Sequence, residues 1–248
     1  MDLHLFNADL HIHTLLSPCG DLNSTPEMIV ETALQKGLDI IGITDHNSTR
    51  HCRLAEHYSH NRDIFVMCGA EVTTKEEAHC LCFFETHETL DLFQQFLDER
   101  LPDIPNNPDY FGDQVQIDEE ENIIYEETRL LTSGLNAEID EISSKVKSLG
   151  GLFIPAHIDK QVNSVISQLG YIPPDIEYDA VELSEHGNKE KILQQHPYLK
   201  NKSFIRSSDA HFLEKIGNVS CQFEIATRSF QEIKKALHNE DGRRVFWT

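Results

Sequence analysis

The chain has 248 residues, of which 39% are hydrophobic, so it can form one sizeable core and we expect a single domain spanning residues 1–248. Its 42 acidic residues outnumber 21 Lys and Arg, and the resulting charge of −21 argues against non-specific binding to nucleic acid or to anionic membranes. Residues 1–4 show neither a basic nor an apolar leader pattern and no run reaches membrane-spanning length, so we expect a cytoplasmic protein with no membrane contact.

The first part of the chain alternates between expected strands and helices. Ser24 or Thr25 can cap a helix that has Pro26 in its first turn and ends near Gly37. Apolar periodicity predicts further helices over residues 49–60 and 90–101, and strands over residues 7–11, 39–43, 64–70 and 78–84.

Residues 102–133 interrupt this alternation. Three prolines break regular structure near its start, and segments 114–118 and 122–127 could form a hairpin across the acidic tip between them. We interpret the segment either as a solvated surface insertion or as a lid or substrate-selecting flap beside the site.

The alternation then resumes. Helices are expected over residues 136–149, 162–169 and 230–238, and strands over 152–156, 180–183, 203–207 and 244–247. Strands that alternate with helices favour a mainly parallel sheet, and about seven such units favour an α/β barrel.

Acidic residues and histidines follow several of the expected strands. His11 and His13 are two positions apart, so in an extended segment both side chains point the same way and can chelate one divalent ion. Single members of such a set have ordinary explanations, such as a core histidine or a turn-capping acid. In a parallel barrel the carboxyl ends of the strands share one face, so the joint pattern predicts a site there, built from His11, His13, Asp45, His46, Glu71, His157, Asp209 and His211.

The residue types indicate the chemistry. Imidazole and carboxylate ligands suit Zn, Mn or Fe better than Ca or Mg, and they do not choose among the first three. A bridging carboxylate such as Glu71 can hold two ions about 3.5–4 Å apart, which generates hydroxide and stabilises both oxygens of an in-line displacement. The sequence shows no Gly-x-Ser-x-Gly and no Ser or Cys beside a suitable base, so no covalent nucleophile is expected.

The six cysteines include no Cys-x-x-Cys pair, and a chain of this length is not typical of a disulfide scaffold. We expect reduced thiols, mostly in strands and core. Cys19 lies between His13 and Asp21 and is the one thiol that we consider as a metal ligand.

Five segments together resemble the PHP (polymerase and histidinol phosphatase) family of metal-dependent phosphoesterases. They are Asp9-Leu-His-Ile-His-Thr, Ile43-Thr-Asp-His-Asn, Gly69-Ala-Glu-Val-Thr with His79 eight residues after the Glu, Pro155-Ala-His-Ile-Asp, and Ser208-Asp-Ala-His. The resemblance implies a distorted (β/α)7, TIM-like barrel with two or three divalent transition-metal ions at its open face, and with residues 102–133 as an insertion.

The resemblance also implies a set of ligands. The first metal would be held by His11, His13, Glu71 and Asp209, and the second by Glu71 as a bridge with His79 and His157. A third would be held by His46, His211 and an acid after the first motif, for which Asp21 is the best candidate, although the stretch 14–21 departs from the family patterns. Asp45 would orient a ligand or carry a proton, and Glu71 would be catalytic as the bridge.

Two cations are candidates for binding a phosphoryl group. Lys160 follows the His157 turn and Arg206 precedes the Ser208 turn, so either could contact a phosphoryl oxygen. Each could instead be a surface charge, and Arg206 could form a buried salt bridge. The sequence contains no Gly-rich phosphate loop, no dinucleotide-binding fingerprint and no basic-aromatic nucleic-acid stripe.

We therefore expect an enzyme that hydrolyses a small phosphomonoester, including the terminal phosphate of a nucleotide or a short oligonucleotide end, by a metal-bound hydroxide. The alternatives are a histidinol-phosphate phosphatase, a non-catalytic regulatory PHP module, and a metal-dependent amidohydrolase, which shares the barrel and the His-x-His start. Glu71 with His79 on the next strand fits the phosphoesterase pattern better. The sequence indicates no self-association face.

Overall fold

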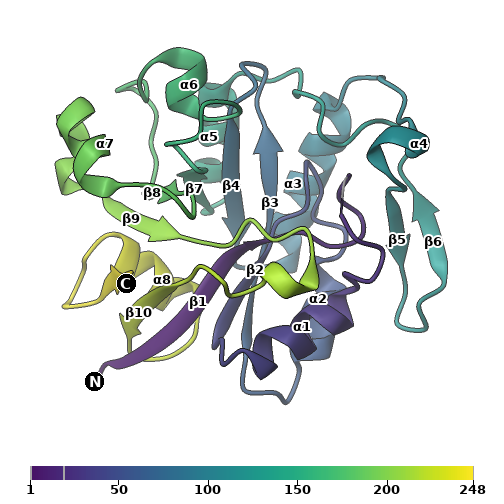
Figure 1. Cartoon of the computed structure of the whole chain (residues 1–248), viewed down its shortest axis with the longest axis horizontal. Helices are drawn as coiled ribbons and strands as arrows, with labels where there is room; N and C mark the ends of the chain where they lie inside the picture. Colours follow the sequence, from purple (N-terminus) through teal and green to yellow (C-terminus); the bar gives the residue numbers. More distant parts are fainter. Residues whose placement is uncertain (1, 19, 248) are drawn as a thin grey trace.

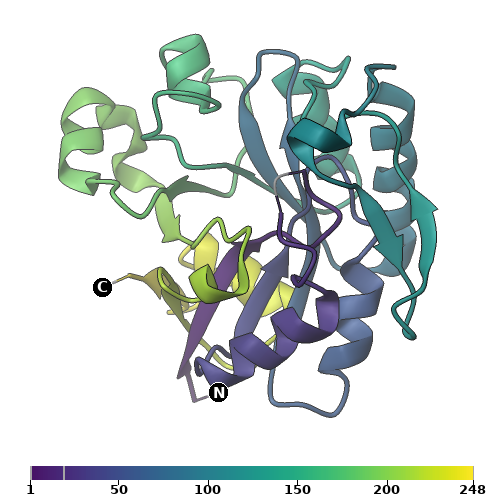
Figure 2. The same ribbon diagram turned by 45° about the vertical axis from the view of Figure 1, so that its right-hand side comes forward.

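A seven-stranded sheet forms the centre of the molecule (Figures 1 and 2). The structure is a computed structural model that describes residues 2–18 and 20–247, so the Cys19 thiol considered above as a ligand lies outside the described residues. The strand order is β11–β10–β1–β2–β3–β4–β7. Its bounds are β1 (His4–Ile12), β2 (Ile40–Ile43), β3 (Phe65–Thr73), β4 (His79–Phe84), β7 (Leu152–Pro155), β10 (Cys221–Ile225) and β11 (Arg244–Phe246).

The sheet is mixed, so the expectation of a mainly parallel sheet is wrong. Only the β1–β2 and β2–β3 pairs are parallel, whereas β3–β4, β4–β7, β1–β10 and β10–β11 are antiparallel. Residues 74–78 join β3 to β4, and a parallel crossover needs a dozen or more residues, so this link allows only a hairpin. The parallel strands β8 (Ala180–Leu183) and β9 (Ser203–Arg206) form a separate pair. The class is α/β as predicted, and these pairings do not confirm the exact (β/α)7 barrel.

The helices pack apolar faces against this sheet. In α1 (Pro26–Gln35) the Thr25 side chain caps the helix by accepting from the Met28 amide, and Pro26, Ile29, Val30 and Ala33 form the buried face. The same principle places α2 (Cys52–Ser59), α3 (His87–Arg100), α5 (Ile139–Ser148) and α8 (Phe230–Leu237). Shorter helices are α4 (Pro108–Phe111), α6 (Val165–Leu169), α7 (Lys189–Gln195), η1 (Pro197–Asn201) and η2 (Leu213–Lys215). Among the described residues, no helix is long and apolar enough to cross a membrane.

The insertion at 102–133 contains the predicted hairpin. Strands β5 (Val115–Ile117) and β6 (Ile123–Glu126) pair antiparallel and stand at one side of the molecule, opposite α7, β8 and β9 (Figure 1). Val115 and Ile117 are buried in a small cluster with Leu15, whereas every residue of β6 is exposed. One face of the hairpin is therefore docked on the loop that follows β1.

The five described cysteines are free and buried. Burial raises the pKa of the Cys80, Cys82 and Cys221 thiols, which keeps them protonated and unreactive. The expectation of reduced thiols in strands and core is confirmed for these residues.

Asn47 joins the end of β2 to the end of the insertion. Its Nδ2 donates to the carbonyls of Leu131 and Ser133, its Oδ1 accepts from the Thr73 amide, and its backbone is left-handed with φ 46°. We expect Asn47→Ala to lower the free energy of unfolding by about 3 kcal/mol, because it removes three hydrogen bonds, two of them fully buried, and places a less suited residue at positive φ. Urea denaturation measures this loss.

Asn61→Ala is the control, since Asn61 is also left-handed but exposed, and its cost should stay near 1 kcal/mol. Equal costs for the two variants would contradict the role of the Asn47 side chain.

Candidate metal centre

The end of β1 presents two histidines on one side of the strand. His11 and His13 are both buried, and the intervening Ile12 points into the core. The segment carrying Asp209 and His211 lies beside them, because the His13 amide donates to the Ala210 carbonyl and the Ala210 amide donates to that of His11. Asp9 lies two residues before His11 on β1. It holds this segment in place by accepting from the Ser208 amide and hydroxyl and from the Gly217 amide.

The neighbouring strand ends supply the remaining ligand candidates. His46 follows β2, Glu71 lies in β3, His79 opens β4 and His157 follows β7. The short β3–β4 hairpin returns His79 to the Glu71 side chain, whose Oε1 lies 2.8 Å from His79 Nδ1. His157 and Asp209 follow the ends of β7 and β9 by two and three residues and have positive φ, 29° and 52°. Positive φ is uncommon for residues other than Gly, although Asp and His adopt it more readily than most.

The first predicted ligand set is assembled. His11, His13, Glu71 and Asp209 each offer one atom to a common group. His11 Nε2 lies 3.3 Å from Glu71 Oε1 and 3.4 Å from Asp209 Oδ1, and His13 Nε2 lies 3.4 Å from Glu71 Oε2 and from Asp209 Oδ1. Ligand atoms at ordinary Zn–N and Zn–O distances in a tetrahedron are about 3.4 Å apart. The spacing therefore suits four ligands around one ion.

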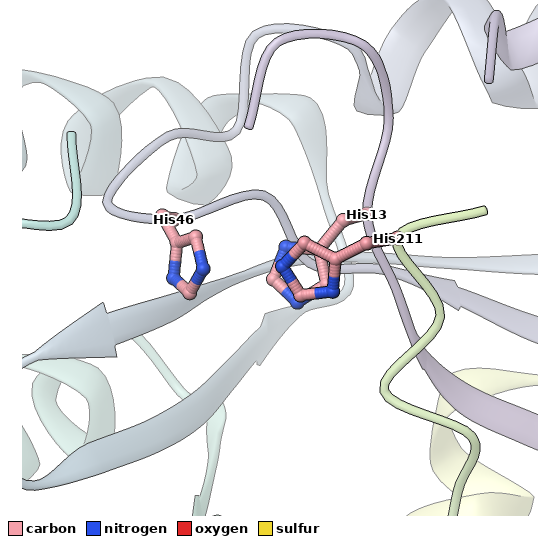
Figure 3. Close-up of side chains that lie close together, drawn as sticks. All are labelled: His13, His46 and His211. Atoms are coloured by element: carbon pink, nitrogen blue, oxygen red, sulfur yellow. The ribbon is translucent and has the colours of Figure 1, made fainter. Parts of the chain in front are cut away.

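Two further groups share members with the first. Glu71 also groups with His46 and His79, and His157 Nε2 lies 3.0 Å from Glu71 Oε1. His13 groups with His46 and His211, and Figure 3 shows the His13 and His211 rings one in front of the other with His46 beside them. Those two rings are stacked with centroids 4.0 Å apart. The Glu71 carboxylate thus lies at the junction of the first two groups, and His13 links them to the third.

The donor set fits divalent metal. Several side-chain atoms in the groups are buried yet, within residues 2–18 and 20–247, have no hydrogen-bond partner: His11 Nε2, His13 Nε2, His46 Nδ1 and Glu71 Oε2. Buried polar atoms are almost always satisfied in native proteins, so unpaired ones that converge on one point fit a metal-binding site. Imidazole nitrogens and carboxylates without thiolate match Zn, Mn or Fe.

The electrostatics favour a cation at this point. Burial lowers the pKa of His46 to about 4 and that of His211 to about 3, so both rings are neutral at pH 7 and can act as ligands. Burial alone would also lower the pKa of His11, but the carboxylates of Glu71, Glu182 and Asp209 raise it well above its usual value. Three carboxylates around one buried ring therefore create a strongly negative potential that a bound cation would neutralise.

Sequence reasoning missed Glu182, a buried residue of β8. Its Oε2 lies 3.1 Å from His11 Nδ1 and accepts from the His157 amide at 3.0 Å. His11 donates Nδ1–H to this carboxylate, which leaves Nε2 as the ligand atom. The available signal was an acidic residue inside the apolar strand Ala-Val-Glu-Leu, where a charge needs a buried partner.

Asp45 lies behind the ligands. Its Oδ1 accepts from the Thr14 amide and the Ser17 hydroxyl at 2.7 Å, and its Oδ2 accepts from the Thr14 hydroxyl at 2.8 Å. Ser17 Oγ in turn lies 3.0 Å from His13 Nδ1. Of the two roles considered, these contacts support orienting a ligand, because the carboxylate is already occupied by protein donors.

Three other predicted site residues differ in placement. Asp21 belongs to none of the groups formed by the described residues, because its carboxylate accepts from the amide and side chain of Asn23 in its own turn. Arg206 donates to the carbonyls of Glu185 and Gly187 and covers the Trp247 ring, so its guanidinium is held by the turn after β8. Lys160 does reach the centre: its Nζ lies 2.5 Å from Asp209 Oδ2, and it lines a cavity of about 200 Å³ together with His46, His79, His157, Asn163 and His211.

Comparison with known sequences decides the family. The sequence model of the PHP domain matches residues 9–170, more than half of the chain. The chain belongs to the PHP family. A second, PHP-associated model matches residues 200–241, the part that contains Asp209 and His211.

Curated relatives span the chain at low identity. The uncharacterized protein YqxK of Bacillus subtilis is 28% identical over 275 residues, which cover 96% of this chain and 63% of that protein. The uncharacterized protein MJ1587 of Methanocaldococcus jannaschii is 25% identical over 194 residues, which cover 75% of this chain and 85% of that protein.

Solved structures show the same fold. The lesion-specific endonuclease PfuEndoQ of Pyrococcus furiosus superposes with TM-score 0.71 at 21% identity, covering 98% of this PHP chain and 58% of that chain. A two-domain protein of Bacteroides vulgatus with a predicted PHP-like metal-dependent phosphoesterase gives TM-score 0.61 at 18% identity, covering 99% and 65%. The chain thus spans less than two thirds of the length of YqxK and of PfuEndoQ.

Proposed function

We propose that this PHP chain is a metal-dependent hydrolase of phosphate esters whose substrate is a small phosphomonoester, including the terminal phosphate of a nucleotide or a short oligonucleotide. The observation that carries the proposal is the position of Glu71, whose carboxylate belongs to two overlapping ligand groups. Two or three divalent ions of Zn, Mn or Fe would be held by His11, His13, His46, Glu71, His79, His157, Asp209 and His211. When bound, paired ions activate water and stabilise the attacking and leaving oxygens of an in-line displacement.

The protein's own residues would position the substrate. Lys160 lies at the edge of the cavity with its charge toward Asp209, so a phosphoryl oxygen that enters there meets both the ammonium group and the ligand cluster. Asn163 in the same wall offers an amide. Among the residues that the structure describes, the cavity of about 200 Å³ suits a phosphoryl group with part of its leaving group.

The net negative charge of the chain favours a substrate that presents only its terminal phosphate to the cavity. A net charge of −21 opposes the many phosphate contacts that duplex binding requires. PfuEndoQ is a lesion-specific endonuclease, and a related structure holds Endonuclease Q on a 27-mer duplex with an abasic lesion. An internal phosphodiester is therefore the second candidate substrate, favoured by that similarity of fold.

We expect the purified protein to contain more than one transition-metal equivalent per chain and to release phosphate from a model monoester. EDTA should abolish the release, and Mn or Zn should restore it, because the ligand groups share Glu71 and His13. Elemental analysis and a phosphate assay measure both. Asp209→Ala should reduce turnover by more than about 100-fold.

The substrate is then assigned by one panel of nucleoside bisphosphates, mononucleotides, histidinol phosphate, short oligonucleotides and duplex DNA with an abasic site. Turnover that survives both EDTA and Asp209→Ala would refute the proposed chemistry. A metal-loaded protein that is inert on the whole panel would support the regulatory alternative. Cleavage of the duplex alone would replace the monoester with a phosphodiester.

A further inference from the structure

His51 is a fully buried histidine that belongs to none of the ligand groups formed by the described residues. Its two ring nitrogens contact two segments that are far apart in the sequence. Nδ1 lies 2.6 Å from Thr14 Oγ1, in the loop after β1, and Nε2 accepts from the Ile117 amide of β5 at 3.1 Å. His51 therefore links the insertion hairpin to the loop that carries His13.

The direction of each hydrogen bond follows from the number of protons available. The Thr14 hydroxyl has one proton and donates it to Asp45 Oδ2 at 2.8 Å, so His51 has to donate Nδ1–H to Thr14 Oγ1. A neutral ring that carries its proton on Nδ1 leaves Nε2 with a lone pair, and the Ile117 amide supplies the matching donor. Both ends of the ring therefore require the same tautomer.

The same argument continues to the metal centre. Asp45 Oδ1 accepts from the Ser17 hydroxyl at 2.7 Å, so the single Ser17 proton is also used. His13 then has to donate Nδ1–H to Ser17 Oγ at 3.0 Å, which leaves its Nε2 free to face Glu71 and Asp209. The chain Ile117–His51–Thr14–Asp45–Ser17–His13 contains no step that is satisfied by solvent, since all six residues are buried.

We propose that His51 is a positioning residue that couples docking of the insertion hairpin to the orientation of the metal ligand His13. The hairpin at 115–126 would then help to position a ligand of the metal centre, in addition to any role as a flap beside the site. Packing of Val115 and Ile117 against Leu15 brings the Ile117 amide to His51, and the buried chain relays this placement to the His13 ring. The inference rests on the proposed function only in taking His13 as a metal ligand.

Two substitutions of His51 test its two ring hydrogen bonds separately. An Asn side chain places its amide nitrogen near the position of Nδ1, so His51→Asn keeps the donor to Thr14 and loses the acceptor for Ile117. A Gln side chain places its oxygen near Nε2, so His51→Gln keeps the acceptor and loses the donor. Coupling requires both contacts in one side chain, so we expect each variant to weaken metal binding by about 5- to 100-fold.

His57→Gln is the matched control. His57 also joins α2 to the hairpin, through Glu119 at 3.6 Å, but it is half exposed and outside the buried chain. Its metal affinity should equal that of the unmodified protein. Titration of the metal-free proteins with Mn or Zn, followed by calorimetry, gives the affinities, and thermal melts show that each variant is folded.

A readout on the hairpin completes the test. Because coupling is reciprocal, metal binding should slow hydrogen exchange of the Ile117 amide in the unmodified protein and should not do so in His51→Asn. Wild-type metal affinity in a folded His51→Asn or His51→Gln would overturn the proposal. If neither variant folds, nitrogen NMR of the unmodified protein decides, since a proton on Nε2 of His51 is incompatible with the chain. Metal affinity is measured without substrate, so an absence of phosphate release would count against the proposed function alone.

Discussion

Replacing Glu71 by Gln is expected to remove most of the bound metal and to reduce phosphate release by more than about 100-fold. The carboxylate lies within reach of five imidazoles, three near Oε1 and two near Oε2. These are His11, His79 and His157 at 3.3, 2.8 and 3.0 Å, and His13 and His46 at 3.4 and 3.1 Å. An amide of the same size would place an NH₂ group at one of these positions, and NH₂ cannot ligate a cation.

Metal per chain by elemental analysis, followed by phosphate assay, measures both losses in the Glu71 variant. In the unmodified protein burial raises the pKa of the Glu71 carboxyl, but the surrounding imidazoles outweigh this effect and hold that pKa well below its usual value. The Gln side chain has no titrating group, so raising the pH should not recover the lost metal. Glu88→Gln, an exposed change in the first turn of α3, is the control and should leave metal content and activity unchanged. A Glu71→Gln protein that keeps two metal equivalents would show that the carboxylate is no bridge.

Local structure followed the sequence closely where a physical signal was local. The Thr25 cap and the insertion hairpin lie where turn chemistry predicted them. Strand β10 was not predicted, although its alternating burial pattern has a period of two. Helix α7 was not predicted either, although Asn188 can cap a helix at that point. Both segments are short and lie between polar segments, so their apolar periodicity is hard to recognise in a single sequence.

Sheet direction was the larger error in the fold. Alternating strands and helices suggested parallel pairing throughout, but the five residues between β3 and β4 already excluded a crossover. The placement of β8 and β9 in a separate pair depends on which distant segments meet, and no local signal determines this.

The candidate site shows the same division. Residues such as His11, His157 and Asp209 were proposed because acids and histidines follow several strands in a joint pattern, although each of them alone has an ordinary explanation. The supporting residues were missed because their roles depend on a partner far along the chain: Glu182 is 171 residues from His11, and His51 is 66 residues from Ile117. Asp21 illustrates the opposite case, since its own turn provides Asn23 as a polar partner. Arg206 instead donates to carbonyls 21 and 19 residues away, in the turn after β8, which is again a contact that no local signal determines.

Glu182 supplies the second large effect, because it holds two ligand candidates at once. Its carboxylate accepts Nδ1–H of His11 and the His157 amide, and His157 has a positive φ of 29°. Glu182→Gln keeps one acceptor oxygen and should weaken metal binding about 10-fold. Glu182→Ala keeps none and should weaken it about 100-fold.

The two variants can be distinguished from a general loss of stability. Metal titration of the folded, metal-free proteins gives the affinity, and steady-state kinetics should show that kcat falls while KM changes little, since Glu182 faces the ligands and does not line the cavity. Glu224→Gln is a matched control on β10, where the carboxylate pairs with Arg244 at the surface. A Glu182→Ala protein that melts earlier but binds metal with unchanged affinity would contradict the assigned role. The graded series from Glu to Gln to Ala is then the signature of a carboxylate that fixes the His11 tautomer, because a purely space-filling residue would show no difference between Glu and Gln.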